Sequence, residues 1–391
     1  MIAEKKIRIS QILVFLGLVS FFRPTIFEKY TWSNTIFNLM LCFSLALCAA
    51  FVFLDKNRNK SRLKLLFILF YALMTFSTFY NKASFSRMLM YVLVGVFSIY
   101  FVEFIIRYEF YYSTRVMRAL YWLFLILNIG SIFMFPEGIT QTGTSESAVW
   151  FLGQSTRFAY FYIPALLFCY LGDIYAFKKI RTNTIVLYFL SLLSVALTRA
   201  MGATLALAAL LLFFVLGKTK LCNGYLFFGS QIAVYVGLTY FSIQEYFENF
   251  LVTVLGKDIT MSSRTLIWRQ VIPLVEENLF WGVGVMDNET MKRLFGFVHT
   301  HNHLLQVTFQ VGYVGLFVFC FALLGVLAVL QKKKDFYISK VLMFFIFMMG
   351  IMLLVDTVDG IRNYYLFVIL MGLFINEIKA LFDRREQREN G

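Results

Sequence analysis

The sequence is short of charge, and this shortage narrows the class of protein. Only 15% of its 391 residues are charged, whereas 60% are hydrophobic and 19% are aromatic. Soluble domains carry roughly 25% charged residues. The apolar residues form continuous runs, and a run of about 17–25 residues spans the ~30 Å hydrocarbon core of a bilayer. The composition therefore excludes an ordinary soluble enzyme and predicts a membrane protein.

Paired cysteines and chains of membrane-embedded acids are also missing. The five cysteines lie in or at the edges of apolar segments and form no CxxC motif, so we expect no disulfides and no cysteine-based metal site. Glu103 and Asp173 lie near the ends of apolar segments, while Asp356 and Asp359 flank a short polar turn. Proton-coupled transporters use a relay of carboxylates within their spans, and this pattern is absent.

Long apolar runs without alternation predict helices, because only helices or closed barrels satisfy their backbone groups in lipid. We therefore predict an all-α polytopic membrane protein, in which residues 1–391 form a single integral membrane domain. Hydropathy indicates about twelve transmembrane helices, with one long extracytoplasmic loop, residues 243–301, between helices 9 and 10. The predicted spans are 9–27, 34–54, 63–81, 88–106, 117–135, 156–176, 183–199, 201–217, 222–242, 302–330, 339–356 and 362–380.

Basic residues set the expected orientation. With the N-terminus in the cytoplasm, most of the 36 Lys and Arg residues fall on cytoplasmic segments such as 56–64 and 332–334, as the positive-inside rule requires. The C-terminus then also lies in the cytoplasm, and the 243–301 loop lies outside. The net charge of +14 reflects topology, so we expect no nucleic-acid partner.

The long outer loop contains a predicted amphipathic helix. Ser262 and Ser263 are suitable N-cap residues, and apolar residues then recur at helical spacing up to a break at Pro273 or soon after it. Arg264 and Arg269 lie on this helix. Five residues correspond to about 140° of rotation, so the two side chains should face different directions.

Two further arginines lie at predicted outer membrane boundaries. Arg199, in "LTRAMGA", occupies a tight turn between the seventh and eighth spans. An arginine this close to hydrocarbon is costly unless it snorkels or pairs, so Arg199 is a candidate site residue. Arg157 begins the sixth span and is a second candidate. Anchoring to lipid phosphate is the alternative role for both residues.

All three histidines of the chain occur in "FVHTHNHLLQ", Phe297 to Gln306. The tenth predicted span is too long for the bilayer core, so its first turns should protrude and place His301 and His303 at the head of a helix. A helix N-terminus attracts anions. On a continuous helix, His299 and His303 would share one face and His301 would lie off it. Three readings stay open here: a catalytic base, polar anchors at the interface, or a metal site, for which the stretch itself offers no carboxylate.

A family resemblance rests on three elements in this order. "LTRAMGATLALAAL" forms a threonine–arginine turn, "SSRTLIW…FWGVG" is an arginine-containing outer loop, and His301-Asn302 followed by Gly312 and Gly315 gives H-N-x9-G-x-x-G. This pattern resembles the O-antigen ligase and Wzy-type polysaccharide polymerase superfamily. A glutamate that often follows the family's histidine motif is replaced here by Gln306 or Gln310.

The resemblance implies metal-independent glycosyl transfer at the outer face of the bacterial cytoplasmic membrane. The donor would be a glycan linked to undecaprenyl diphosphate, the acceptor a second glycan, and no cofactor is expected. By this analogy His301 would be the general base, while Arg199 and Arg264 would hold the diphosphate, for which arginine donors are well suited. The supporting substrate-binding residues would be Arg157, Arg269, Asn302, His299 and His303.

Within this superfamily we favour a polymerase of surface polysaccharide repeat units, such as capsule, exopolysaccharide or O-antigen. The aromatic, Lys- and Ile-rich composition is typical of low-GC Gram-positive bacteria, which lack lipid A. The alternative is an O-antigen ligase that transfers the glycan to the lipid A core. A transporter of lipid-linked glycan is a third reading. Membrane lipid, a flippase and a chain-length regulator are the expected partners.

Overall fold

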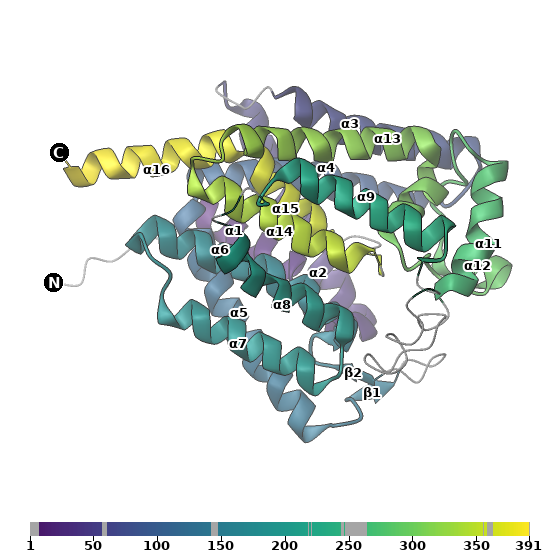
Figure 1. Ribbon diagram of the computed structural model, residues 1–391, viewed down its shortest axis with the longest axis horizontal. Coiled ribbons are helices and arrows are strands. Elements are labelled where there is room, and N and C mark those ends of the chain that lie inside the picture. Colours follow the sequence, from purple (N-terminus) through teal and green to yellow (C-terminus); the bar gives the residue numbers. More distant parts are fainter. Residues whose placement is uncertain are drawn as a thin grey trace. The chain divides into compact units, whose positions relative to one another are not determined.

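The computed structural model describes residues 8–56, 61–141, 148–217, 219, 221–243, 246, 264–354, 356, 357 and 363–390. It is built almost entirely from helices, which Figure 1 shows in sequence colours. The chain divides into two compact units. Unit 1 comprises residues 1–59, 97–209 and 374–391, and unit 2 comprises residues 60–96 and 210–373. The prediction of a single domain stays untested, because two compact units can belong to one membrane domain.

Unit 1 is organised around a helix that is buried along most of its length. Nearly continuous burial from Phe158 to Asp173 makes α6 the core helix, and α5 and α7 pack against it. The three short strands form an antiparallel sheet in the order β1-β2-β3. The elements of this unit are α1 (Ile9–Phe21), η1 (Thr25–Lys29), α2 (Thr31–Leu54), part of α4 (Phe85–Tyr108), α5 (Phe110–Met134), β1 (Thr140–Gln141), β2 (Ala148–Trp150), β3 (Gly153–Gln154), η2 (Ser155–Arg157), α6 (Phe158–Phe177), α7 (Thr182–Leu197), part of α8 (Met201–Leu216) and α16 (Ile375–Asn390).

Buried carboxylates in unit 1 are matched by hydrogen-bond donors. Asp173 is fully buried on α6, where the Arg118 guanidinium lies 2.5 Å from its Oδ1 and the Thr184 hydroxyl donates to its Oδ2. Glu103 is also fully buried and forms an ion pair with Arg107 one turn later on α4. A buried charge is tolerated when it is paired and hydrogen-bonded. These acids therefore have structural partners and do not form a relay along a path.

Unit 2 is built on α13, which packs against α3, α9, α14 and α15; α3 and α13 run side by side in Figure 1. The α14 and α15 helices are largely buried, as hydrophobic residues on all sides of a helix require. The elements of this unit are α3 (Arg62–Tyr80), the start of α4, the end of α8, α9 (Gly224–Tyr240), α11 (Arg264–Glu277), α12 (Asn288–Phe295), α13 (His303–Lys332), α14 (Tyr337–Leu353) and α15 (Tyr364–Leu373).

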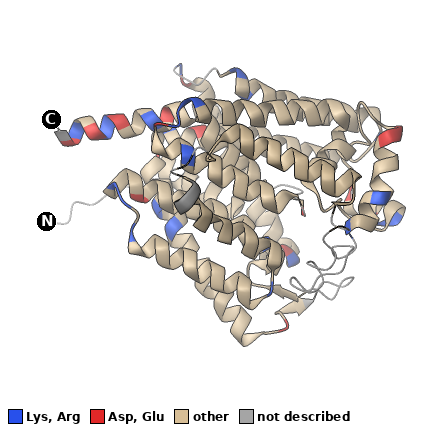
Figure 2. Cartoon of the chain, in the orientation of Figure 1, with Lys and Arg blue, Asp and Glu red and all other residues tan. Residues whose placement is uncertain are grey.

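Helices lie in all the predicted spans, but the number twelve is not confirmed, and the predicted span 362–380 is interrupted at Phe374 between α15 and α16. The described residues contain seven helices long and apolar enough to cross a membrane, or eight if α15 and α16 form one span broken at Phe374. The first span is shorter than predicted and ends at Phe21, because Pro24 disfavours a helical backbone at the residue before it. Lys, Arg, Asp and Glu are sparse along the helices and gather at their ends and on α16, as Figure 2 shows. The chain is a multi-pass helical membrane protein.

The predicted amphipathic helix exists as α11. It passes through Pro273 and ends at Glu277. The N-cap residues predicted for it, Ser262 and Ser263, fall outside the described residues, as do residues 244, 245 and 247–261 of the predicted 243–301 loop. A second helix, α12, follows and had no counterpart in the predictions. Asp287 caps it by accepting hydrogen bonds from the backbone and hydroxyl of Thr290, which lower the pKa of the Asp287 carboxyl.

Candidate functional site

The candidate site is built on the segment between α12 and α13, residues 297–302. Asn302 is the N-cap of α13, and its Oδ1 accepts the backbone N–H of Leu305 at 3.1 Å. Its Nδ2 donates to the Leu354 carbonyl, just beyond α14, at 3.0 Å. Asparagine is among the best N-cap residues. The asparagine of the H-N motif thus ties the start of α13 to the end of α14.

Two further elements hold the residue before His301. The backbone N–H of Thr300 donates to Oε1 of Gln306, one turn inside α13, at 2.9 Å. The carbonyl of Thr300 accepts the indole N–H of Trp268 on α11 at 2.8 Å, and Trp268 is almost completely buried. A glutamate side chain could accept the same hydrogen bond from the Thr300 backbone. Gln306, where the family pattern often has glutamate, therefore preserves this contact.

His301 adopts a left-handed backbone conformation, with φ of 53°. Residues other than glycine seldom adopt this conformation, which costs roughly 1–2 kcal/mol. Hydrogen bonds on both sides of the residue, at Thr300 and Asn302, offset this cost. About a third of the His301 side chain is exposed.

A carboxylate from a distant part of the sequence lies beside His301. Oδ1 of Asp356 is 3.5 Å from Nδ1 of His301, close enough for an ion pair when the imidazole is protonated. The backbone N–H of Thr357 donates to the same Asp356 oxygen at 2.8 Å. The His299 ring packs edge-on against the His301 ring, with the centroids 4.0 Å apart. The structure therefore brings together His299, His301 and Asp356.

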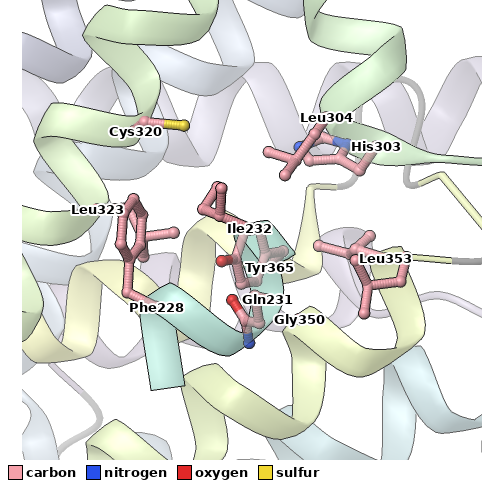
Figure 3. Close-up of a pocket in the computed structure, with 11 residues that line it drawn as sticks. Phe228, Gln231, Ile232, His303, Leu304, Cys320, Leu323, Gly350, Leu353 and Tyr365 are labelled. Carbon is pink, nitrogen blue, oxygen red and sulfur yellow. The ribbon is translucent and has the colours of Figure 1, made fainter. Parts of the chain in front are cut away.

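The predicted arrangement of the three histidines is wrong in one respect. The helix begins only at His303, so His299 and His303 do not share a helical face. His303 is buried, packs edge-on against Phe319 and Tyr365, and lies 3.5 Å from the Thr357 hydroxyl through Nδ1. Figure 3 shows it on the wall of a small, mostly apolar pocket in unit 2. His303 thus packs in the core, while the two preceding histidines stay together.

The α11 arginines face different directions, as the spacing predicted. Trp268, which contacts the Thr300 carbonyl, lies four residues after Arg264 and therefore on the same face of α11. Arg264 is half-buried, whereas Arg269 is exposed. The structure thus places Arg264 on the face of α11 that contacts the histidine segment, and Arg269 off that face.

Arg157 and Arg199 belong to unit 1 and are exposed. Arg199 sits between α7 and α8 with φ of 53°, a position at which helices commonly use glycine. Its backbone N–H donates to the Ala196 carbonyl, which closes the turn. Arg157 ends η2 directly before α6. The tight turn expected around Arg199 is present, but Arg199 is not buried.

Gly312 of the motif allows a break in the backbone of α13. Gly312 interrupts the helix with φ of 71° and ψ of −175°. The "FWGVG" loop packs into this break: Val283 N–H donates to the Phe309 carbonyl and Tyr313 N–H donates to the Leu279 carbonyl. A Cβ at Gly312 would lie 2.2 Å from the Phe280 carbonyl oxygen, so no side chain fits. The loop therefore fixes the first half of α13, which carries the histidine segment.

Two residues of this site escaped prediction from the sequence. Asp356 was noted only as flanking a turn, and Trp268 was not singled out. Their partners lie far away in the sequence, at His301 and Thr300, so no local spacing connects them. The available signals were weak: an acid next to an apolar run, and a tryptophan on the apolar face of an amphipathic helix.

The helices and this site define a multi-pass membrane protein with two histidines and an aspartate gathered at the head of a helix. Residues 185–320 match the O-antigen ligase family model, which confirms the resemblance to the O-antigen ligase and Wzy-type superfamily. The matched stretch includes Arg199, Arg264, His301 and both motif glycines. Members of this family are glycosyltransferase-like enzymes that act on lipid-linked glycans. No curated protein matches the chain.

Proposed function

We propose that the protein joins undecaprenyl-diphosphate-linked oligosaccharide repeat units into a surface polysaccharide at the outer face of the cytoplasmic membrane. The observation that supports this proposal is the 3.5 Å pairing of His301 Nδ1 with Asp356 Oδ1 at the capped head of α13. His301 lies within the stretch that matches the family model, and Asp356 lies beyond it. A carboxylate at one imidazole nitrogen directs the proton to that nitrogen and leaves the other free to accept one.

In the proposed reaction the base acts on the acceptor glycan. Nε2 of His301 takes the proton from the acceptor hydroxyl, whose oxygen forms a bond to the anomeric carbon of the donor. The bond from that carbon to the diphosphate oxygen breaks, and undecaprenyl diphosphate leaves with the electron pair. Asp356 stabilises the imidazolium that forms. No metal takes part in these steps.

The leaving diphosphate gains negative charge in the transition state and needs cationic donors. We propose Arg264 for this role, because it lies on the face of α11 that contacts the histidine segment. Arg199 is proposed as a second diphosphate ligand, and the only basis for this role is the threonine–arginine pattern in the sequence. Arg157, Arg269, Asn302 and His299 stay proposed as supporting residues. Asn302 supports the site through the backbone of α13.

An O-antigen ligase is the second candidate, and the description of the matched family favours it. The two candidates share donor chemistry and differ in the acceptor. Purified protein should therefore be given the lipid-linked repeat unit alone, and separately with lipid A core. A ladder of lengthening chains from the repeat unit alone supports the polymerase; transfer that needs lipid A core supports the ligase.

The base assignment is tested by His301→Ala in the same assay. We expect the protein to fold and bind donor but to lose at least about a hundredfold in transfer rate, the typical contribution of a general base. Thermal unfolding and size-exclusion profiles check that the fold is retained. A His301→Ala protein that still makes long chains at the wild-type rate would refute the assignment.

A further inference from the structure

Three side chains of types that commonly bind metals lie close together in space, although they come from separate parts of the sequence. The imidazole nitrogens of His299 and His301 and a carboxylate oxygen of Asp356 all lie within 4.8 Å of one another. The sequence expectation of no metal rested on the absence of a carboxylate from residues 297–306. Asp356, which follows α14, supplies that carboxylate. The set therefore merits evaluation as a cation site.

The geometry and chemistry of the set select one class of cation. Zinc bonds of about 2.0–2.2 Å place two ligands of a tetrahedral ion about 3.4 Å apart, and Nδ1 of His301 lies 3.5 Å from Oδ1 of Asp356. Two imidazoles and one carboxylate form a ligand set found in zinc sites with an open position. Magnesium and calcium prefer oxygen ligands throughout, so a borderline transition metal fits this set best.

The ligands are held in place by their surroundings. The hydrogen bonds of Thr300 and Asn302 fix the backbone on both sides of His301, and Thr357 N–H donates to Asp356. Nδ1 of His301 is shielded from solvent and lies 3.5 Å from Oδ1 of Asp356. A metal could thus bind between these two atoms in place of the proton on Nδ1. Such outer contacts orient metal ligands and typically raise affinity.

We propose that His299, His301 and Asp356 form an inhibitory binding site for Zn²⁺. The inference that this binding inhibits rests on the proposed function, in which His301 is the base. A neutral imidazole that binds a metal through Nδ1 carries its proton on Nε2, so it cannot accept another from the acceptor hydroxyl. The metal also occupies the Asp356 oxygen that would stabilise the imidazolium. One ion thus removes both parts of the proposed base.

Metal binding is measured first, without reference to activity. Purified full-length protein is titrated with Co²⁺, whose visible absorption reports nitrogen and oxygen coordination, and Zn²⁺ is then added in competition. We expect one Co²⁺ per chain, displaced by Zn²⁺. His299→Ala and Asp356→Asn should each weaken binding by about tenfold or more. His303→Gln is the matched control, because His303 lies outside the set, and its affinity should equal that of the wild type.

Inhibition is measured separately in the transfer assay. Zn²⁺ should inhibit the wild type and EDTA should restore the rate, while His299→Ala should need at least tenfold more Zn²⁺ for half inhibition. If no Co²⁺ binds, or if the three variants bind Co²⁺ with equal affinity, the proposed metal site is wrong and the proposed function is unaffected. If the protein binds Co²⁺ as expected but transfers no glycan, the proposed function is wrong and the proposed metal site stands. Loss of transfer on adding EDTA alone overturns the inhibitory role, because the metal would then be required.

Discussion

Individual residues matter in this site through the contacts around them. A left-handed backbone does not by itself mark a functional residue, because Lys82, Lys178 and Ser242 adopt it as well as His301 and Arg199. His301 differs from the ordinary turn residues in its neighbours, which hydrogen-bond to α11, α13 and the end of α14. Its strained conformation is thereby fixed, as the proposed role of a positioned base requires.

Asp356 should act through His301 rather than through the fold. Asp356→Asn removes the negative charge that would stabilise the imidazolium, so we expect kcat to fall by about a hundredfold or more while KM changes little. Steady-state kinetics with the lipid-linked repeat unit provide the measurement.

A matched variant controls for this effect. Asp335→Asn changes an exposed acid beyond the end of α13 and should keep wild-type kinetics. The thermal unfolding temperature of Asp356→Asn shows whether the fold is retained. If KM rises while kcat is unchanged, Asp356 contributes to donor binding and the proposed pairing with the base is wrong.

At the scale of elements, α13 is two helical pieces joined at Gly312. Ser77 on α3 reinforces the joint, since its hydroxyl contacts the carbonyls of both Trp281 and Gln310. Asn81, the C-cap of α3, donates to the Gly282 carbonyl at 2.9 Å. The long predicted span is therefore an interrupted helix whose first half is positioned by a loop and a neighbouring helix.

Gly312→Ala should destabilise the protein and lower activity together. The Cβ would clash with the Phe280 carbonyl in addition to straining a positive φ, so we expect a loss of about 2–4 kcal/mol. Gly296→Ala is the control, because Gly296 has a similar φ of 74° but nothing within 4 Å of its Cβ. It should cost only about 1 kcal/mol. Denaturant unfolding in detergent compares the two, and equal losses would mean that backbone strain alone explains the Gly312 requirement.

The sequence predicted the elements better than the contacts between them. Hydropathy located the helices to within a few residues for most spans, and apolar periodicity located α11. The break at Gly312 was missed because apolar residues continue across it without interruption. His301, Asn302 and Arg264 were named from motifs, whereas Asp356 and Trp268 needed tertiary contacts that no periodicity encodes.

At the scale of the whole molecule, the distribution of basic residues predicts the orientation of the chain in the membrane. Cysteine replacements at Leu294, exposed on α12, and at Lys334, exposed after α13, test it with a membrane-impermeant maleimide on intact cells. Leu294→Cys should be labelled directly and Lys334→Cys only after permeabilisation. Labelling above the background of the five native cysteines is the measurement. The reverse pattern would place the histidine segment in the cytoplasm and refute the proposed location.

The bond from Asn302 to the Leu354 carbonyl has a consequence for biosynthesis. Trp268, His301 and Gln306 leave the ribosome well before Leu354 and Asp356, which follow α14. Chains generally acquire structure from the N-terminus as they are made, yet the head of α13 cannot be completed until α14 has been inserted. A nascent chain that stops short of Asp356 would thus present its first membrane helices without the carboxylate of the proposed base, and the proposed transfer would begin only after α14 has been made.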